Sequence, residues 1–510
     1  MTQTLSSDAT AYAEGRLDSR SRVAIILLLA AVFVVFLNET FLSVALSDID
    51  KDLQISPTLG QWLSTGFALT MAVIIPITGW MLQRLNTRPV FIAAMSLFTA
   101  GTLIAATAPG FPLLLLGRIV QASGTAMMMP LMMTTIMTLV PPQSLGRMMG
   151  RISIVMSVAP AVGPTISGFL LPLVHWRGLF WVMLPIAAAM LVVGIFRVPN
   201  VSEPRKAPLD VLSVILSAIA FSGLVYGLST LGQAAEGDAA LPAWIPIAIG
   251  SVFLVVFVLR QLRLQRTDSA LLDLRTFKAR TFTMSLTMLA VSMVALFGTV
   301  IVLPLYMQNV LHQSTVVIGL TLLPGGLLMG LMGPLVGRLY DRFGPTPLVV
   351  PGAAVVSSVF FGFSFLSTTT PVWLIIVAYL ALSLGLAFLF TPLFTSALGA
   401  LPPHLYSYGS ATLATIQQVA GAAGTAIFIA LLAIGSGGAA AELGNAAPGA
   451  IDTASIAAGV RLAFLVGGVV SLAALALAFF VRKPPAPEVP EGEGADGGFA
   501  VGNEIAAPTH

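Results

Sequence analysis

Long apolar runs divide this chain almost from end to end. Fourteen of them have about the length, roughly 20 residues, that an α-helix needs to cross the hydrocarbon core of a bilayer. Because a backbone in lipid must satisfy its own hydrogen bonds, such runs are expected to fold as helices. The runs are 23–46, 61–82, 89–108, 112–139, 148–172, 179–196, 209–231, 243–259, 282–306, 314–336, 347–367, 372–397, 408–435 and 457–481. The sequence therefore predicts an all-α integral membrane protein with 14 transmembrane helices.

The composition excludes several classes of site. Of 510 residues, 57% are hydrophobic and only 9% are charged, whereas soluble domains are about one quarter charged. The chain has no cysteine, which excludes disulfides, thiolate metal sites and cysteine nucleophiles. Its four histidines, His175, His312, His404 and His510, do not have the spacing of metal ligands. We expect neither a metal nor a cofactor.

The basic residues predict the topology. If the N-terminus is cytoplasmic, the segments on that side hold all but four of the 24 Lys and Arg residues. The exceptions are Lys51, Arg118, Arg177 and Arg461. Lys and Arg collect in cytoplasmic connections, so the pI near 9.3 reflects topology, and we expect no nucleic-acid partner. An even number of helices places both termini in the cytoplasm, and we expect a multi-pass protein of the plasma (inner) membrane.

A weak internal repeat divides the chain into halves. The segment Gly79–Leu85 aligns with Gly337–Phe343, and the same offset relates Gly163 to Gly421. Parallel repeats of six helices are typical of secondary transporters. The predicted units are a cytoplasmic N-terminal segment, two six-helix bundles, a linker with two inserted helices, and a disordered cytoplasmic tail. The N-terminal segment is 1–22 and the tail is 482–510. The two bundles are 23–196 and 281–481, and the linker between them is 197–280.

One charge pair stands out within the apolar runs. Glu39 is the only acidic residue well inside a run, and Arg118 lies in the fourth run, followed by Gln121. Ionisable groups in a membrane are expensive and are usually functional. At about 1.5 Å per residue, both side chains lie roughly 10 Å below the outer boundary. We predict that they share one cavity and handle protons; the alternative is a static buried ion pair that only orients two helices.

Small residues and prolines mark the fifth run. Pro160, Gly163, Pro164 and Gly168 occur within ten residues, and such residues permit close helix packing and a kink or pivot. The alternative is ordinary Gly and Pro usage in membrane helices.

Two cytoplasmic connections repeat a pattern of glycine and charge. The second copy contains Gly337, Arg338, Asp341 and Arg342, whereas the first has Gln83 at the acidic position and ends with Arg84. An acid that faces arginines can latch neighbouring helices in one conformation and release them in another. We predict a cytoplasmic gate, although the arginines alone also fit simple positive-inside anchors.

These motifs resemble those of the major facilitator superfamily. The loops resemble its cytoplasmic loop motif, Arg118–Gln121–Gly124 matches the Arg-x-x-Gln-x-x-Gly pattern of proton-coupled members, and 159–168 resembles the antiporter motif, with Ala159 and Ser167 in place of two glycines. Further segments strengthen the resemblance to the fourteen-helix drug:proton antiporters of the EmrB type, over nearly all of residues 20–482. They are 61–67, 176–181, 304–310 and 417–421, and 36–40 is most similar to the lincomycin-resistance branch.

The resemblance implies a proton-coupled multidrug exporter of amphiphilic or antibiotic compounds, working by alternating access. Many members of the family have Asp where this chain has Asn38, so the acid is displaced by one residue, about 100° around the helix. The candidate substrate-cavity residues are Phe36, Asn38, Phe67, Tyr306 and Gln308. The expected partners are small molecules, protons and the lipid bilayer, and a monomer is expected.

The sequence also bears on two other classes of function. An exporter of one specific metabolite on the same scaffold stays an alternative, because nothing in the sequence separates drug from metabolite. A membrane enzyme or a passive channel is disfavoured by the absence of catalytic motifs and by the two-half repeat. With no nucleotide-binding motif, the energy source is expected to be a proton gradient.

Overall fold

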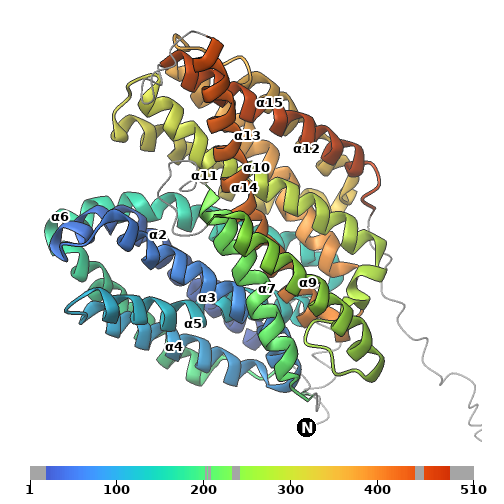
Figure 1. Ribbon diagram of the computed structural model, residues 1–510. Helices are drawn as coiled ribbons and strands as arrows, with labels where there is room; N and C mark the ends of the chain where they lie inside the picture. The colour runs from blue at the N-terminus through green and yellow to red at the C-terminus, as the bar shows by residue number, and fades with distance from the viewer. Residues whose placement is uncertain (1–18, 202–203, 205–207, 232–241, 443–452, 483–510) are drawn as a thin grey trace, which may run out of the picture.

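The computed structural model describes residues 19–201, 204, 208–231, 242–442 and 453–482, and this described part of the chain is helical, without strands (Figure 1). The long helices are α2 (Ser19–Asp52), α3 (Pro57–Arg84), α4 (Thr87–Ala106), α5 (Phe111–Leu139), α6 (Leu145–Arg197), α7 (Val211–Ser229), α9 (Trp244–Leu264), α10 (Arg280–Asn309), α11 (Thr315–Phe343), α12 (Thr346–Phe363), α13 (Val372–Gly399), α14 (Tyr406–Glu442) and α15 (Thr453–Ala478). Short 3₁₀ helices are η1 (Pro142–Ser144), η2 (Gln265–Thr267), η3 (Leu274–Lys278) and η4 (Pro403–Leu405).

The helices confirm the predicted membrane-spanning architecture. Thirteen described helices are long and apolar enough to cross a bilayer. One of them, α6, has 53 residues, and it contains a break at His175, whose φ is 60°. A straight helix of that length would measure roughly 80 Å, far more than a bilayer core of about 30 Å. The break at His175 separates the predicted spans 148–172 and 179–196, so the fourteen predicted spans all fall on described helices.

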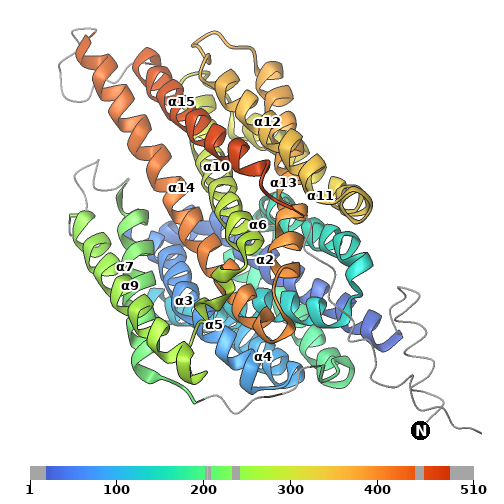
Figure 2. The same cartoon turned by 90° about the vertical axis from the view of Figure 1, so that its right-hand side faces the viewer.

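The helices pack in two groups, with a pair beside them. Helices α2 to α6 contact one another, and so do α10 to α15. Helices α7 and α9 pack together, and α7 touches both α3 of the first group and α14 of the second. Figure 2 shows this pair in green beside α3 and α14. The predicted N-terminal segment and tail lie almost entirely outside the described residues, although α2 already begins at Ser19.

The outer surface of the helices is strongly apolar. Large side chains such as Phe169, Phe365 and Trp373 are 74%, 82% and 64% exposed. A soluble monomer rarely exposes large contiguous apolar patches, whereas lipid-facing helices do so necessarily. The chain is therefore a multi-pass membrane protein.

Glycine brings the two groups together at one end of the molecule. A Cβ placed on Gly150 of α6 would lie 2.2 Å from the carbonyl oxygen of Gly333 on α11, and one on Gly337 would lie 2.1 Å from that of Gly146. No side chain fits between backbones at this separation. We call this end, where α3 and α11 finish and α6 and α14 begin, the gate face.

Candidate functional site

Arg118 is the centre of a buried polar chain that joins α5 to α4. Its side chain is 1% exposed, and its Nη1 donates to Oε1 of Gln121 at 2.7 Å. Gln121 Nε2 in turn donates to the hydroxyl of Thr102 at 2.8 Å. Gly101 permits this approach, since a Cβ there would lie 2.4 Å from the backbone nitrogen of Gln121. The predicted pair of Arg118 and Gln121 is thus brought together, and it is anchored to a neighbouring helix.

The guanidinium of Arg118 also lies over an aromatic ring. Its central carbon is 4.1 Å from the centroid of Phe67 on α3, and Phe67 is 3% exposed. A cation over a ring face is attracted electrostatically, most strongly where water is excluded. Arg118 Nε has no hydrogen-bond partner in the described part of the chain. The guanidinium is therefore held on one side by Gln121 and on its face by Phe67.

Glu39 lies on α2 within electrostatic reach of this guanidinium. Arg118 is the charged group that acts on Glu39, and Glu39 is the one that acts on Arg118. The ion pairs found between described residues do not include a contact of these two within 4.0 Å. The shared proton-handling cavity of Glu39 and Arg118 stays a prediction, and the contacts of the Arg118 side chain are with Phe67 and Gln121.

The small residues of α6 pack against α2 beside Glu39. A Cβ on Gly163 would lie 1.8 Å from the hydroxyl oxygen of Thr40, and the hydroxyl of Ser167 donates to the carbonyl of Phe41 at 3.1 Å. Gly168, in contrast, is exposed and has open space around its Cα. One face of the predicted motif therefore holds the segment of α2 that carries Glu39.

The two prolines of that motif are less buried than Gly163. Pro160 is exposed and Pro164 is partly buried, and both lie within the first span of α6.

At the gate face, Asp341 of α11 caps the start of α6. Its Oδ1 accepts from the backbone N–H of Gly146 at 2.7 Å, and its Oδ2 accepts from that of Arg147 at 2.9 Å. The first N–H groups of a helix lack intrahelical partners and carry partial positive charge. The acidic position of the second loop motif therefore joins the two helix groups directly.

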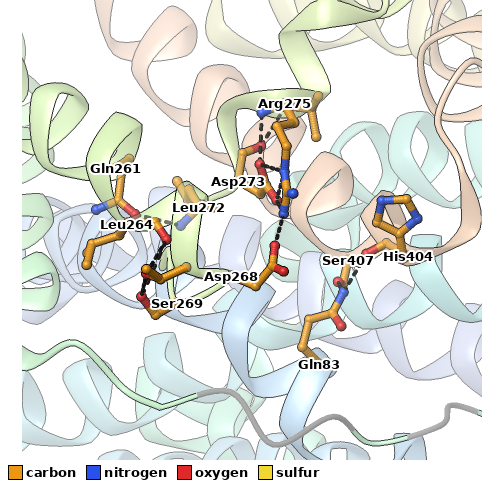
Figure 3. Close-up of polar contacts among 12 residues, drawn as sticks. Gln83, Gln261, Leu264, Asp268, Ser269, Leu272, Asp273, Arg275, His404 and Ser407 are labelled. Atoms are coloured by element: carbon orange, nitrogen blue, oxygen red, sulfur yellow. Dashed lines mark hydrogen bonds and ion pairs between the residues drawn. The ribbon is translucent and has the colours of Figure 1, made fainter.

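The first loop motif makes a corresponding contact without a charge. Gln83 of α3 donates from Nε2 to the carbonyl of His404 at 2.8 Å and to the hydroxyl of Ser407 at 2.6 Å, at the start of α14 (Figure 3). Both copies of the motif thus connect a helix end of one group to a helix start of the other. In this chain, Gln83 replaces the acid with an amide donor.

The arginines of the gate are exposed, and two of them lie near aromatic rings. Arg84, Arg338 and Arg342 are exposed, and the guanidiniums of Arg84 and Arg342 lie 5.6 Å and 5.0 Å from the rings of Trp80 and Phe343.

The proposed substrate-cavity residues are dispersed. Phe36 is partly buried on α2, and Asn38 is 3% exposed with its Oδ1 unpaired among the described residues. Tyr306 is fully buried in the second helix group, and its hydroxyl donates to the carbonyl of Ser367 at 2.5 Å. Gln308 is exposed near the end of α10. Of this set, the structure places Phe67 against Arg118.

Comparison with known proteins decides the family. Residues 28–425 match the family model of the Major Facilitator Superfamily. The chain belongs to the major facilitator superfamily.

Relatives of this chain include proteins named for resistance to lincomycin or to several drugs. It is 40% identical to the lincomycin resistance protein LmrB of Listeria monocytogenes, over 89% of this chain and 95% of that protein. It is 31% identical to the multidrug resistance protein B homolog of Mycobacterium tuberculosis, over 81% of this chain and 76% of that protein. The predicted resemblance to this transporter family is confirmed.

Solved structures show the same fold at low identity. The proton:xylose symporter XylE has a TM-score of 0.60 and 14% identity, and the match covers 91% of this chain and 96% of that one. The human organic anion transporter MFSD10 has a TM-score of 0.59 and 14% identity, covering 90% of this chain and all of that one. At such identities the likeness concerns the fold alone.

A further polar network of this superfamily member escaped the sequence analysis. Arg260 binds the Asp210 carboxylate through Nε at 2.7 Å and Nη2 at 2.8 Å, and these bonds lower the pKa of Asp210 to about 2. Gln261, fully buried, donates to the hydroxyl of Ser213 and accepts from the N–H of Leu271 at 2.8 Å. The network ties α7, α9 and the connection after α9 together. An Asp before a helix, with Arg and Gln about 50 residues later, was the only signal available.

The connection itself is fixed by Arg275. This guanidinium contacts Asp268 and Asp273, each at 2.5 Å (Figure 3), and these bonds raise the pKa of Arg275. Leu271 and Leu272 are buried in a cluster that includes Ala72 of α3 and Ala411 of α14. The inserted pair and its connection thus contact both helix groups near the gate face.

Proposed function

We propose that the chain is a proton-coupled exporter of amphiphilic or antibiotic compounds. The observation that carries the proposal is the buried guanidinium of Arg118, within electrostatic reach of Glu39, inside helices long and apolar enough to cross a membrane. A carboxylate in such a place is expected to bind and release protons as its surroundings change. The names of the resistance relatives support drugs as the cargo.

Transport would follow alternating access, without covalent chemistry. The contacts of Asp341 and Gln83 close the gate face, and their release would let the two helix groups separate there. From the positive-inside rule we expect the gate face and both termini on the cytoplasmic side of the membrane. In this orientation the structure corresponds to a state closed toward the cytoplasm. Protons would enter from outside as the drug leaves.

The α6 contacts would transmit the change at Glu39. Gly163 and Ser167 contact α2 at Thr40 and Phe41, directly after Glu39, so a movement of this part of α2 must be shared by α6. Helix α6 also begins at the Asp341 cap and packs along α11. A single helix therefore links the proton-binding segment to the gate face.

The test uses inverted membrane vesicles that contain wild type, Glu39→Gln or Asp48→Asn. Asp48 is a matched control, because it is a carboxylate on the same helix but outside the predicted membrane core. With an acidic vesicle interior, lincomycin and ethidium should accumulate in wild type and Asp48→Asn. In Glu39→Gln, gradient-driven accumulation should be lost.

Two other outcomes would redirect the assignment. If Glu39→Gln accumulates both compounds as wild type does, the proton is carried elsewhere. If wild type moves neither compound, the drug assignment is wrong, and a screen of cell metabolites as counterflow substrates is the next measurement.

A further inference from the structure

Phe67 occupies a position where the two helix groups meet. It forms a small apolar cluster with Met71 and Ile75 of α3 and with Ala122 and Ala126 of α5, and Ala414 of α14 packs against this cluster. Helix α14 belongs to the second group, and it contacts both α3 and α5. The ring under Arg118 is therefore part of the packing between the groups.

Two groups can attract the guanidinium of Arg118. Its guanidinium rests on the Phe67 ring at 4.1 Å, and Glu39 acts on it through space without an ion pair in this state. Arg118 Nε is unpaired among the described residues. Because Nη1 is already bound to Gln121, Nε leaves part of the guanidinium free for a second acceptor.

We propose that Arg118 moves between two positions, the Phe67 ring and the Glu39 carboxylate, and that the ring face it vacates binds the cationic or aromatic part of the exported compound. This inference rests on the proposed function and deepens it, since it names a residue that makes proton and drug compete. Phe67 is a specificity-determining residue in this scheme. The drug displaces Arg118 from the Phe67 ring, and the proton displaces Arg118 from the Glu39 carboxylate.

The direction of the coupling follows from the charges. When Glu39 is ionised it attracts the guanidinium, and the Phe67 ring is uncovered. When Glu39 binds a proton this attraction is lost, Arg118 returns to the ring, and a drug there is displaced. The present structure, closed at the gate face with Arg118 on Phe67, matches the state after drug release. The cycle is that of an antiporter.

The other charged residues on the helices around Arg118 lie at the helix ends. Helices α2, α3, α4 and α14 pack against α5. In the sequence, α3 and α4 carry charged residues only at the ends, Arg84 and Arg88, and α14 carries only Glu442, at its end. Helix α2 contributes Glu39; Arg20 and Arg22 lie in its first turn, and its other acids and Lys51 lie in its last turns. Arg118 and Glu39 are therefore the pair whose charges decide the position of the guanidinium.

The ring face suits a cationic or aromatic ligand. Aromatic faces attract cations, and the attraction grows when both groups are out of water. Aromatic drug rings also stack on such a face. Ethidium is both cationic and aromatic, and its charge does not depend on pH, so it is a suitable probe.

The experiment measures ethidium binding to the purified full-length protein in lipid nanodiscs between pH 5 and pH 9. The variants are Phe67→Leu, Phe67→Met and Phe67→Tyr, with Phe464→Leu as a matched loss of a buried ring in the second helix group. Melting temperatures show that each variant folds. Phe67→Met is the second variant if Phe67→Leu does not fold, because a flexible methionine fills the space without a ring face.

In wild type, ethidium binding should strengthen as pH rises. In Phe67→Leu and Phe67→Met, the Kd should increase roughly threefold to tenfold, because the cation–π contact is lost. The pH of half-maximal binding should fall by about half a unit or more, because Arg118 then favours ionised Glu39. Phe67→Tyr and Phe464→Leu should behave as wild type.

The outcomes separate the two proposals. If wild type neither binds ethidium in a pH-dependent way nor moves it with the gradient, both proposals are overturned. Suppose instead that wild type binds ethidium in a pH-dependent way and moves it with the gradient. If Phe67→Leu and Phe67→Met then keep either the wild-type Kd or the wild-type pH of half-maximal binding, the inference about Phe67 is overturned and the antiporter proposal stands. If Phe464→Leu shows the same two shifts, the effect belongs to general packing, and the Phe67 assignment is again overturned.

Discussion

The Asp341 carboxylate oxygen lies 2.7 Å from the backbone nitrogen of Gly146, and this contact joins the two helix groups at the gate face. The same carboxylate accepts from the N–H of Arg147. A charged acceptor at a helix start gains both from hydrogen bonding and from the helix dipole. The closed gate is therefore partly an electrostatic structure, whose strength a single substitution can change.

We expect Asp341→Asn to favour opening of the gate face. The amide keeps one acceptor but loses the charge and the second acceptor, which costs the closed state about 1–2 kcal/mol. Ser410 is 2% exposed there, so a cysteine placed at Ser410 reports the opening. Its maleimide labelling rate should rise roughly 5- to 30-fold in Asp341→Asn. Arg342→Gln, which removes an exposed charge from the next residue, is the control. Equal labelling rates of the Ser410→Cys protein alone, with Asp341→Asn and with Arg342→Gln would contradict the prediction.

A disulfide across the gate should lock the transporter. The hydroxyls of Thr134 on α5 and Ser410 on α14 are 2.7 Å apart, close enough for two cysteines to pair. Because the chain has no cysteine of its own, Thr134→Cys/Ser410→Cys gives a clean readout. Oxidation should abolish gradient-driven ethidium transport, and reduction should restore it, while each single variant is unaffected. Undiminished transport by the fully crosslinked protein would show that α5 and α14 need not separate.

The sequence was sufficient for the spans but not for the contacts between them. Apolar runs located the membrane helices because burial in lipid imposes length and composition. From the sequence, Arg118 was predicted to be a proton-coupling residue and Phe67 a cavity residue. Their contact with each other could not be predicted, because it depends on how α3 and α5 pack. Asp341 was expected to face arginines; its acceptance from the backbone of Gly146 could not be read from side-chain identity.

Gln83 illustrates a second limit. In the sequence it is a departure from the acidic position of the loop motif, with no partner indicated. Its amide instead donates to groups 321 and 324 residues away, His404 and Ser407. A donor is useful where the partner is a carbonyl, and only tertiary structure supplies that information.

Gly163 and Gly168 should respond differently to an added methyl group. In Gly163→Ala, the Cβ would collide with Thr40, and such overpacking typically costs about 1–3 kcal/mol. In Gly168→Ala, the Cβ meets open space, so the change should be within about 0.5 kcal/mol. We expect Gly163→Ala to lower both the melting temperature and the transport rate. Similar losses in the two variants would mean that the motif acts through both glycines and not through the contact with α2.

The last prediction concerns acid stability of the inserted helix pair. Bonds from Arg260 lower the pKa of Asp210 from 3.8 to about 2. Since the folded-state pKa lies below the unfolded one, this carboxylate stabilises the protein above about pH 4, and its contribution is lost as the pH falls from 3.8 toward 2. Wild type should therefore melt at a higher temperature than Asp210→Asn at pH 7, and the gap should narrow as the pH approaches 3. Asp268→Asn is the control, because Asp268 is 78% exposed and Arg275 keeps Asp273; its melting temperature should remain near that of wild type. Asp210 also caps the start of α7 by accepting from the backbone N–H of Ser213 at 3.1 Å. A difference in melting temperature between wild type and Asp210→Asn that is equally large at pH 7 and pH 3 would contradict the charge-based account and assign the loss to the geometry of this cap.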